Sequence, residues 1–458
     1  MKLTVPWLKK HLSTKTSLDQ IVGALTNIGL EVEDVIKPDA NLKLFKVVKI
    51  IKTEKHPNAD KLKICDVDVN GKLEKVVCGA SNARDGLLTV YAPPGAVIPK
   101  NGMKLVVAQI RGVESKGMLC SESELGVSEI SDGIIEIKNK KVGENFFKNS
   151  DDVIDISITP NRSDCLGIKG IARDLSAYGL GKLIEEKKIK LKEQSKKKIK
   201  VVIKKNSGCN TFGSLYIEGI KNCESPKWLK KDLKALGLKP ISAVVDITNY
   251  IMFDLNRPMH AYDSDKINGN IIIRQSKNGE SFEALDEKKY IILGNACVIT
   301  DEKKILGLGG IIGGQSSAIN FDTKNIVLEA AAFDPVKIAK VSKQLGIITD
   351  AKFRFERGVD PNSIENGLKL AAKLIQEICG GKISKINITG NNKFNKRKIK
   401  FDINNFKKLI GFSVSSKDCQ KILATLGFTF KVKKQVLDIE VPSWRPDVNQ
   451  EADIIEEI

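Results

Sequence analysis

The sequence contains little histidine, few aromatic residues and no membrane-length apolar run. Only three histidines occur among 458 residues, and aromatic residues make up 5% of the chain. The nine cysteines are scattered without a Cys-x-x-Cys pair, so zinc-ligand spacing is absent, and their odd number favours reduced, buried thiols. No run of 18 apolar residues occurs, so no membrane helix is predicted. The opening MKLTVPWLKKHL lacks the apolar segment of a signal peptide, which indicates a cytoplasmic protein.

The chain is rich in positive charge. Lys and Arg number 75 against 56 Asp and Glu, which gives a formal net charge of +19. Basic side chains neutralise phosphates, so a polyanionic partner such as a nucleic acid is indicated. Lys, Ile and Asn are all abundant, as they would be if the base composition of the gene raised the lysine content. Charge alone therefore does not decide whether the chain binds nucleic acid. The lysine-rich stretch 185–205 favours a solvated linker, with an RNA-contacting basic strip as the alternative.

Periodicity divides the chain into several segments, and its length indicates about three domains. Residues 17–30 predict a helix that begins with a capping box of Ser17 and Gln20, and 31–37 predict a strand. Short alternating strands separated by turns fill 42–147, which fits a five-stranded OB-type barrel of the kind that binds oligonucleotides. Residues 155–179 predict a strand, a turn and an amphipathic helix. Strands and helices mix over 208–390, and from 397 helices, a hairpin and a final helix are expected.

Two loops of the predicted barrel carry side chains suited to RNA. Asn58 and Lys61 belong to the turn and strand of HPNADKLKI, and Asn82 and Arg84 to CGASNARDG. Small residues let a backbone approach a ligand, and Arg84 is suited to phosphate. Each loop alone is also typical of an ordinary surface turn.

The chain closes on SWRPDVNQEADIIEEI, which contains five carboxylates, and four of them are candidate ligands: Asp447, Asp453, Glu456 and Glu457. They form either a solvated acidic face or a set of oxygen ligands for Mg²⁺. Adjacent Glu456 and Glu457 point roughly 100° apart on a helix, so one ion shared by both requires a facing partner.

Seven segments occur along the chain in this order: EKHPNADKLKICDVDV, VVCGASNARDG, VAQIRGVESKGMLCSESELG, ITPNRSDCLGIKGIARDLSA, AVVDITNYIMFDLNRPMHAYD, TDAKFRFERGVDP and VPSWRPDVNQEADIIEEI. Together they resemble, in the same order, motifs of bacterial phenylalanyl-tRNA synthetase β subunits. The resemblance covers essentially the whole chain, and because the family's β subunit is longer, this chain resembles its N-terminal portion.

The resemblance implies a multidomain α/β (α+β) fold. An N-terminal α+β domain would comprise 1–38 and 149–190, with a tRNA-binding OB-fold β-barrel, 39–148, inserted in it. A mixed α/β editing domain would follow at 200–392. A small helical, winged-helix-like domain with the acidic metal-site helix, 396–458, would end the chain in truncated form.

The resemblance also implies a function. The β subunit would bind tRNA(Phe), hydrolyse mischarged Tyr-tRNA(Phe) and support an α subunit that joins phenylalanine to tRNA with ATP, in a heterotetramer of two α and two β subunits. A second sieve is chemically reasonable, because a pocket shaped for Phe rejects an added hydroxyl only about 10²-fold. No membrane or DNA partner is expected. The alternative is a tRNA-binding scaffold subunit that does not edit.

The resemblance places an editing site on residues 208–390. His260 would orient a water or the ester beside Asn249 and Thr248. Gly310 lies in the glycine-rich loop GLGGIIGG, residues 307–314. Glu329, on a predicted strand, would contact the tyrosine hydroxyl. Thr349 and Ala351 would line the same pocket. Asp447, Asp453, Glu456 and Glu457 would bind Mg²⁺ shared with the α subunit.

The chain departs from the family at two places. Gly309 to Gly314 read GGIIGG where the family commonly has AGVMGG, and Lys352 stands where a small residue is usual. Neither change removes a polar catalytic group, so they bear on pocket shape. Arg354, Glu356 and Arg357 suit either a tRNA clamp or a buried ion-pair network.

Overall fold

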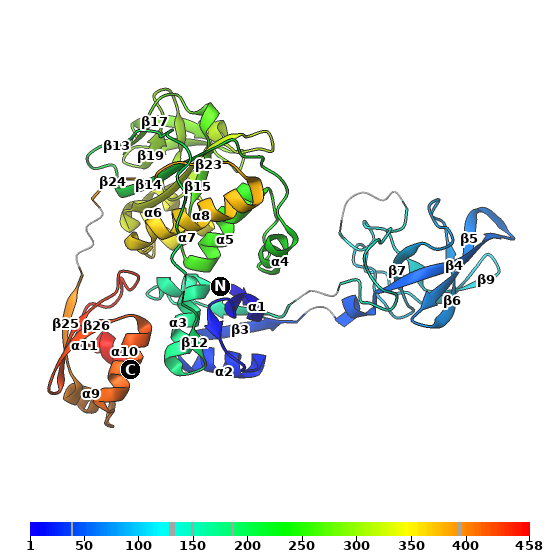
Figure 1. Cartoon of the computed structure of the whole chain (residues 1–458), viewed down its shortest axis with the longest axis horizontal. Coiled ribbons are helices and arrows are strands. Elements are labelled where there is room, and N and C mark those ends of the chain that lie inside the picture. Colours follow the sequence, from blue (N-terminus) through cyan, green and yellow to red (C-terminus); the bar gives the residue numbers. More distant parts are fainter. Residues whose placement is uncertain (38–39, 128–132, 148–150, 186, 392–395) are drawn as a thin grey trace. The chain divides into compact units, whose positions relative to one another are not determined.

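The computed structural model describes the chain except residues 38–39, 128–132, 148–150, 186 and 392–395 (Figure 1). It divides into two compact units, one made of Met1–Val35 with Val153–Ile458 and the other of Ile36–Asp152. The fold is mixed α/β, as predicted. The narrower domain boundaries remain a prediction. Among the described residues, no helix has the length and apolarity needed to cross a membrane.

The unit Ile36–Asp152 is built on an antiparallel sheet of five strands in the order β10-β7-β4-β5-β6. The five-stranded OB-type barrel stays a prediction. A separate hairpin pairs β8 with β9. The bounds are β4 Lys46–His56, β5 Ala59–Val69, β6 Lys72–Cys78, β7 Leu88–Ala92, β8 Val107–Ile110, β9 Val113–Lys116 and β10 Met118–Leu119.

The N-terminal part of the other unit joins both ends of the inserted segment. A three-stranded sheet has the order β1-β11-β3, so residues before and after the insertion share one sheet. Helix α2 begins with the predicted capping box between Ser17 and Gln20. The bounds are β1 Lys2–Thr4, α1 Val5–Leu8, β2 Leu12–Ser13, α2 Leu18–Asn27, β3 Glu31–Ile36, β11 Val153–Ser157, α3 Ile168–Tyr178 and β12 Lys182–Leu183.

The segment from Val201 to Gly390 contains two five-stranded sheets. One has the order β13-β16-β19-β20-β21 and the other β15-β22-β14-β23, with β24 also paired to β14. The strand bounds are β13 Val201–Ile203, β14 Cys209–Glu218, β15 His260–Asp263, β16 Ile271–Gln275, β17 Asn278–Glu283, β18 Lys289–Leu293, β19 Cys297–Thr300, β20 Ile305–Leu308, β21 Ile312–Gly313, β22 Asn325–Phe333, β23 Lys382–Ile383 and β24 Asn387–Gly390.

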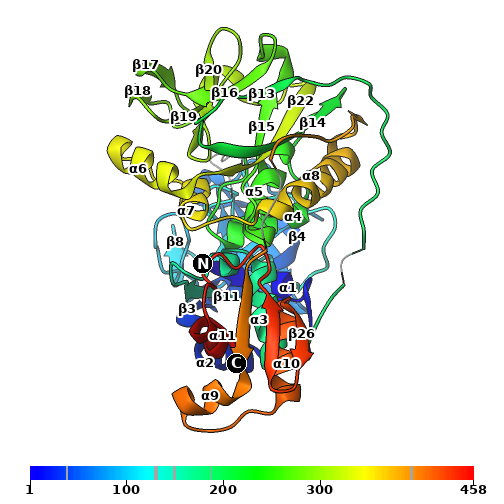
Figure 2. The ribbon, with the colours of Figure 1, turned by 90° about the vertical axis from the view of Figure 1, so that its left-hand side faces the viewer.

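Alternation along β14 and β22 assigns their two faces to different cores. Leu215 and Leu328 pack in the core that includes α5 and α8. Tyr216 and Val327 pack in the core shared with the sheet that contains β16, β19 and β20. Helices α5 and α8 lie on one side of the sheet that contains β14, as Figure 2 shows. The helix bounds are α4 Lys227–Ala235, α5 Ala243–Leu255, α6 Pro335–Leu345, α7 Asp350–Phe355 and α8 Ile364–Cys379.

The C-terminal segment combines a small sheet with three helices. The predicted hairpin is β26–β27, and a strand that the sequence analysis did not predict, β25, adds to it in the order β25-β27-β26. Ile399 and Phe401 of β25 are buried between exposed lysines, which is a strand's alternation. The bounds are β25 Lys398–Asp402, α9 Ile403–Ile410, α10 Ser416–Leu426, β26 Thr429–Lys433, β27 Val436–Glu440 and α11 Glu451–Glu457.

Candidate active site

Two neighbouring strands bring the predicted histidine and acid together. Strand β15 pairs with β22 in antiparallel register, and His260 lies directly opposite Glu329. Glu329 has the parity of Val327 and Ala331, which face the core between the two sheets. Directly opposite residues in an antiparallel pair have Cβ atoms about 4.5–5.5 Å apart, so the pairing forces the two side chains to be neighbours.

The pair faces a small cavity of about 200 Å³ between the two sheets. The glycine-rich loop forms one wall, and the start of α7 forms another. Of the predicted site residues, the structure brings four to this cavity: His260, Gly310, Glu329 and Ala351. The other residues that line it are Pro258, Met259, Tyr262, Leu285, Ile299, Gly307, Leu308, Ile311, Ile312, Gly313 and Phe355.

One ring nitrogen of His260, Nε2, makes no hydrogen bond to the described residues. This nitrogen is buried. Burial lowers the pKa of His260 to about 4, so the imidazole is neutral at pH 7. A neutral imidazole offers one donor and one acceptor nitrogen. The side chain is therefore suited to holding a water or a substrate carbonyl by a hydrogen bond rather than to acting as a strong base.

Glu329 is a buried acid, and among the described residues one side chain, that of Tyr262, donates a hydrogen bond to it. The pKa of Glu329 is raised to about 7 by burial, and the hydrogen bond from the Tyr262 hydroxyl opposes that rise. The pKa of Tyr262 itself lies well above its usual value because the phenol is buried beside this carboxyl. Near pH 7 the Glu329 side chain thus exists partly as a carboxylate, which is an acceptor for a hydroxyl donor in the cavity.

The glycine-rich loop approaches the site closely. Gly310 has φ +73°, and a Cβ there would lie 2.9 Å from both Ile338 Cδ1 and Phe333 Cδ2. At Gly313, a Cβ would lie 2.5 Å from His260 Cε1. At Gly310 both the left-handed backbone and the close contacts favour glycine, whereas at Gly313 the close approach to His260 does so alone.

Thr349 supports the loop from outside the cavity. It is the N-cap of α7, accepting a hydrogen bond from the Lys352 amide, and its hydroxyl donates to the Ile311 carbonyl at 2.7 Å. Ala351, two residues further on, reaches the cavity.

Two predicted residues lie elsewhere. Thr248 and Asn249 belong to α5 and do not line this cavity. Thr248 is buried and donates to the carbonyl of Val245 at 2.7 Å, as serine and threonine side chains commonly do within helices. Their assignment to the site remains a prediction from the resemblance.

Tyr262 also lines the cavity, and the sequence alone did not single it out, although the motif HAYD places it two residues after His260. Residues i and i+2 of a strand share a face, so a strand beginning at His260 places Tyr262 beside it. The rings of His260 and Tyr262 meet edge to face with their centroids 4.4 Å apart.

The four predicted RNA-contacting residues all lie in the unit Ile36–Asp152. Asn58 and Lys61 are exposed, and the Asn58 amide donates to the Arg111 carbonyl at 3.0 Å. Asn82 donates to the Ile134 carbonyl at 2.8 Å, and the exposed Arg84 forms a two-pronged pair with Glu136 at 2.7 and 2.8 Å. Exposed ion pairs contribute little to stability, so Arg84 can exchange Glu136 for a phosphate at small cost.

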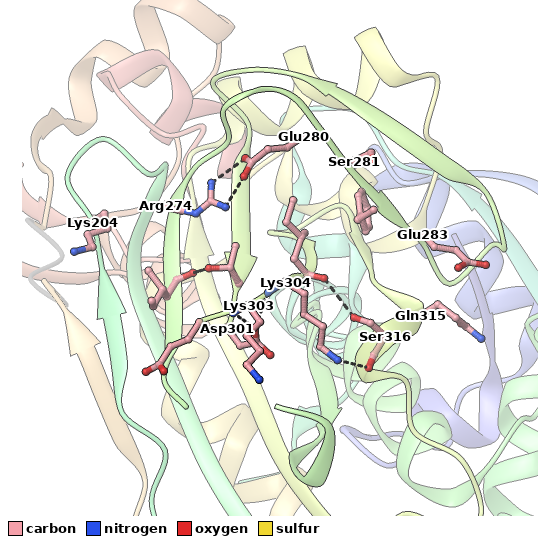
Figure 3. A pocket seen from close by; sticks show the side chains of 15 residues that line it. Lys204, Arg274, Glu280, Ser281, Glu283, Asp301, Lys303, Lys304, Gln315 and Ser316 are labelled. Carbon is pink, nitrogen blue, oxygen red and sulfur yellow. Dashed lines mark hydrogen bonds and ion pairs between the residues drawn. The ribbon is translucent and has the colours of Figure 1, made fainter. Parts of the chain in front are cut away.

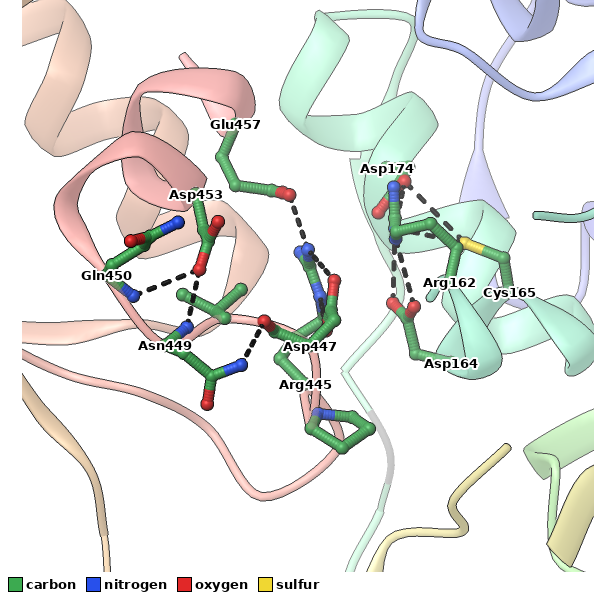
Figure 4. Close-up of polar contacts among 12 residues, drawn as sticks. Arg162, Asp164, Cys165, Asp174, Arg445, Asp447, Asn449, Gln450, Asp453 and Glu457 are labelled. Carbon is green, nitrogen blue, oxygen red and sulfur yellow. Dashed lines mark hydrogen bonds and ion pairs between the residues drawn. The ribbon is translucent and has the colours of Figure 1, made fainter. Parts of the chain in front are cut away.

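Two of the closing acids, Asp447 and Glu457, are paired with an arginine (Figure 4). Arg445 donates to both oxygens of Asp447, at 2.9 and 2.7 Å, and forms an ion pair with Glu457. Burial lowers the pKa of Arg445, but the bonds to Glu457 and Asp447 raise it above its ordinary value. Asp453 accepts the backbone amides of Asn449 and Gln450, which makes it a capping residue of α11. Glu456 is exposed.

This arrangement does not fit a Mg²⁺ ion held by the four acids. Two of the carboxylates, Asp447 and Glu457, are paired with Arg445, and a third, Asp453, caps α11. Within the described part of the chain, the one cluster with metal-ligand spacing is instead Asp164, Cys165 and Asp174. Arg162 already serves those two carboxylates, donating to Asp164 at 3.1 and 3.2 Å and to Asp174 (Figure 4). A guanidinium therefore stands where a cation would be needed in both places.

Arg354 resolves one alternative left open by the sequence. Its side chain is 2% exposed, pairs with Asp350 at 3.0 Å, and lies over the Phe253 ring at 4.3 Å. Arg354 is therefore part of a buried network rather than a clamp for tRNA.

A larger groove of about 810 Å³ lies on the sheet that contains β16, β19 and β20 (Figure 3). Its charged groups are mostly paired within the chain: Arg274 bonds Glu280 at 2.9 and 2.7 Å, and Lys304 donates to the Ser316 carbonyl. Asp301 accepts the amides of Lys303 and Lys304 at 2.7 Å. The cavity at His260 is the better candidate for chemistry, because its buried imidazole Nε2 has no partner among the described residues and stays available to a ligand.

Comparison with known proteins gives matches along the chain. Three family models match: "Putative tRNA binding domain" at residues 45–145, "B3/4 domain" at 208–380 and "tRNA synthetase B5 domain" at 399–458. The chain is 44% identical over 464 residues to a phenylalanine–tRNA ligase beta subunit of Rhodopseudomonas palustris and 43% identical over 466 residues to that of Brucella suis. These alignments cover 100% of this chain and 58% of each relative.

A solved structure also matches. It is an N-terminal fragment of the phenylalanyl-tRNA synthetase beta subunit from Pyrococcus horikoshii, with 11% identity and a TM-score of 0.43 over 100% of this chain and 97% of that one.

Proposed function

The chain is a homologue of phenylalanine–tRNA ligase beta subunits along its whole length, and on this premise we propose that it binds tRNA(Phe) and hydrolyses tyrosine wrongly attached to it. The cavity at His260 and Glu329 carries the proposal. It combines a neutral imidazole, whose Nε2 has no partner among the described residues, with a buried acid opposite it. The first group is suited to a water or an ester, and the second to a phenolic hydroxyl.

The chemistry would proceed as follows. The tyrosyl side chain enters the cavity, and its phenolic hydroxyl donates a hydrogen bond to Glu329. A phenylalanyl side chain has no such donor. A buried acceptor left without a donor is costly, so the site favours the tyrosyl ester. His260 holds the attacking water, and the glycine-rich loop brings backbone amides near the ester carbonyl. Water attack on the carbonyl carbon releases tyrosine and regenerates the free terminal hydroxyl of the tRNA.

The remaining assignments follow from the same premise. The unit Ile36–Asp152 would contact tRNA phosphates through residues such as Lys61 and Arg84. An α subunit would supply the ATP and phenylalanine sites in a cytoplasmic heterotetramer, while this chain contributes tRNA binding and proofreading. Mg²⁺ shared with that subunit would require Asp447 and Glu457 to leave Arg445.

Incubation with Tyr-tRNA(Phe) tests the proposal against a scaffold that does not edit. The chain, alone and together with the α subunit, should release tyrosine faster than buffer. His260→Ala should slow this release without weakening tRNA binding, since the imidazole contacts the ester and not the phosphates. Ester that stays intact at the buffer rate would favour the scaffold. Affinity for tRNA should also fall steeply with salt, because phosphate contacts release counterions.

A further inference from the structure

Tyr262 lies between the two side chains on which the proposed function rests. It follows His260 by two residues on β15, and the two rings meet edge to face at 77°. The Tyr262 hydroxyl donates a hydrogen bond to Oε2 of Glu329. Its side chain is almost fully buried, at 1% exposure, and lines the cavity. One phenol thus touches both the imidazole and the acid.

The hydrogen bond leaves Glu329 with one oxygen committed and one available. Among the described residues, Tyr262 alone donates to this carboxyl, through Oε2. A carboxylate accepts through both of its oxygens, so Oε1 remains open to a donor in the cavity. A carboxylate fixed at one oxygen also has less rotational freedom to lose when a ligand binds the other.

We propose that Tyr262 is a positioning residue that fixes the Glu329 carboxylate, so that Oε1 recognises the phenolic hydroxyl of the tyrosyl ester. The inference rests on the proposed hydrolysis of that ester and adds a residue to its specificity. In this role the Tyr262 hydroxyl acts on the ester through Glu329.

The surroundings of Glu329 make this single donor important. Among the described residues, the titratable groups near the carboxyl besides Tyr262 are His260, Cys209 and Cys297. Burial keeps all three uncharged at pH 7: it lowers the pKa of His260 to about 4 and raises that of Cys297 to about 12, and the pKa of Cys209 lies well above its usual value. None of these groups supplies a positive charge. The Tyr262 hydroxyl is therefore what favours the ionised form of Glu329.

Tyr262→Phe removes one oxygen atom and keeps the ring, so it tests the hydroxyl alone. The rate of Tyr-tRNA(Phe) hydrolysis should rise with pH through a midpoint near 7 in the unaltered chain, following ionisation of Glu329. Loss of a hydrogen bond to a charged group should move this midpoint upward by about one to two units in Tyr262→Phe. The rate at pH 7 should consequently fall about 5- to 50-fold, with recovery toward pH 8.5.

A double-mutant cycle separates positioning from general support of the fold. Glu329→Gln should flatten the pH profile, and adding Tyr262→Phe to Glu329→Gln should cost no further activity. Incorporation of 3-fluorotyrosine at position 262, a stronger donor, should shift the midpoint downward. An unchanged midpoint in Tyr262→Phe, or a loss that simply adds to that of Glu329→Gln, would overturn the inference. If the unaltered chain leaves the ester intact, the proposed function fails instead.

Discussion

Replacing Gly313 by alanine places a single methyl group against the His260 ring. The new Cβ would lie 2.5 Å from His260 Cε1 and 2.9 Å from Leu285 Cδ1, while ordinary contact begins at 3.4 Å. The imidazole or the loop must therefore move by about 0.9 Å. A misplacement of about 1 Å at a reacting group costs on the order of 10²-fold in rate. Overpacking of this kind also costs about 1–3 kcal/mol of stability.

The assay is single-turnover hydrolysis of Tyr-tRNA(Phe), with tRNA affinity measured in parallel. Gly313→Ala should reduce the rate roughly 100-fold. Binding of tRNA should stay unchanged, because the residues proposed to contact phosphate, such as Lys61 and Arg84, lie in the unit Ile36–Asp152 and not beside Gly313. Gly23→Ala on α2 is the matched control, since a Cβ there meets nothing within 4 Å. A Gly313→Ala chain that hydrolyses at the rate of the control would refute the reasoning, because His260 would then not need its observed position.

Three further predictions concern ionisation and charge. In the folded chain the pKa of Glu329 is about 7, against a usual 4.5, so the folded state holds the proton more tightly than the unfolded state. The free energy of unfolding should therefore fall by about 3 kcal/mol as the pH rises from below 4.5 to above 7. Unfolding measured at pH 5 and pH 8 should show this loss in the unaltered chain, and Glu329→Gln should lack it. Arg445→Ala leaves Asp447 and Glu457, whose side chains are 11% and 7% exposed, without their cation, and urea unfolding should lose about 3–5 kcal/mol. The exposed control Lys396→Ala should leave the midpoint unchanged. Calorimetric titration of the chain alone should show only weak Mg²⁺ binding, and saturation at micromolar Mg²⁺ would contradict the role assigned to Arg445.

Local signals in the sequence were sufficient for several elements. The capping box of Ser17 and Gln20 depends on residues three apart, and the structure shows both of its hydrogen bonds. Glu329 was placed on a strand because NIVLEAAAF is a short apolar run, and β22 spans Asn325–Phe333. Strand β25 was missed although Lys398 to Phe401 alternate, because lysine-rich segments are more often solvated.

Long-range contacts were beyond the sequence. A cluster of acids in the sequence suggests a metal site, because the sequence shows their charge. It does not show that Arg445 lies between Asp447 and Glu457 and pairs with both, since this depends on the fold. The hydrogen bond from Tyr262 to Glu329 joins residues 67 apart. No periodicity encodes such a pairing, since it requires the register of β15 on β22. The resemblance to a known family supplied Glu329 as a site residue but gave no reason to notice Tyr262.

That register has its own physical support in Arg257. The arginine lies three residues before His260, is fully buried, and donates to the Ala331 carbonyl of β22 and the Ser363 hydroxyl, both at 2.7 Å, and to the Asp360 carbonyl. Burial lowers the pKa of Arg257 to about 10, which still leaves it charged at pH 7, and each bond offsets part of the cost of its burial. A slip of one residue between strands would turn every side chain to the opposite face. Arg257 ties the chain just before His260 to a point two residues beyond Glu329, so the same buried charge that costs desolvation also keeps the imidazole and the acid in one cavity.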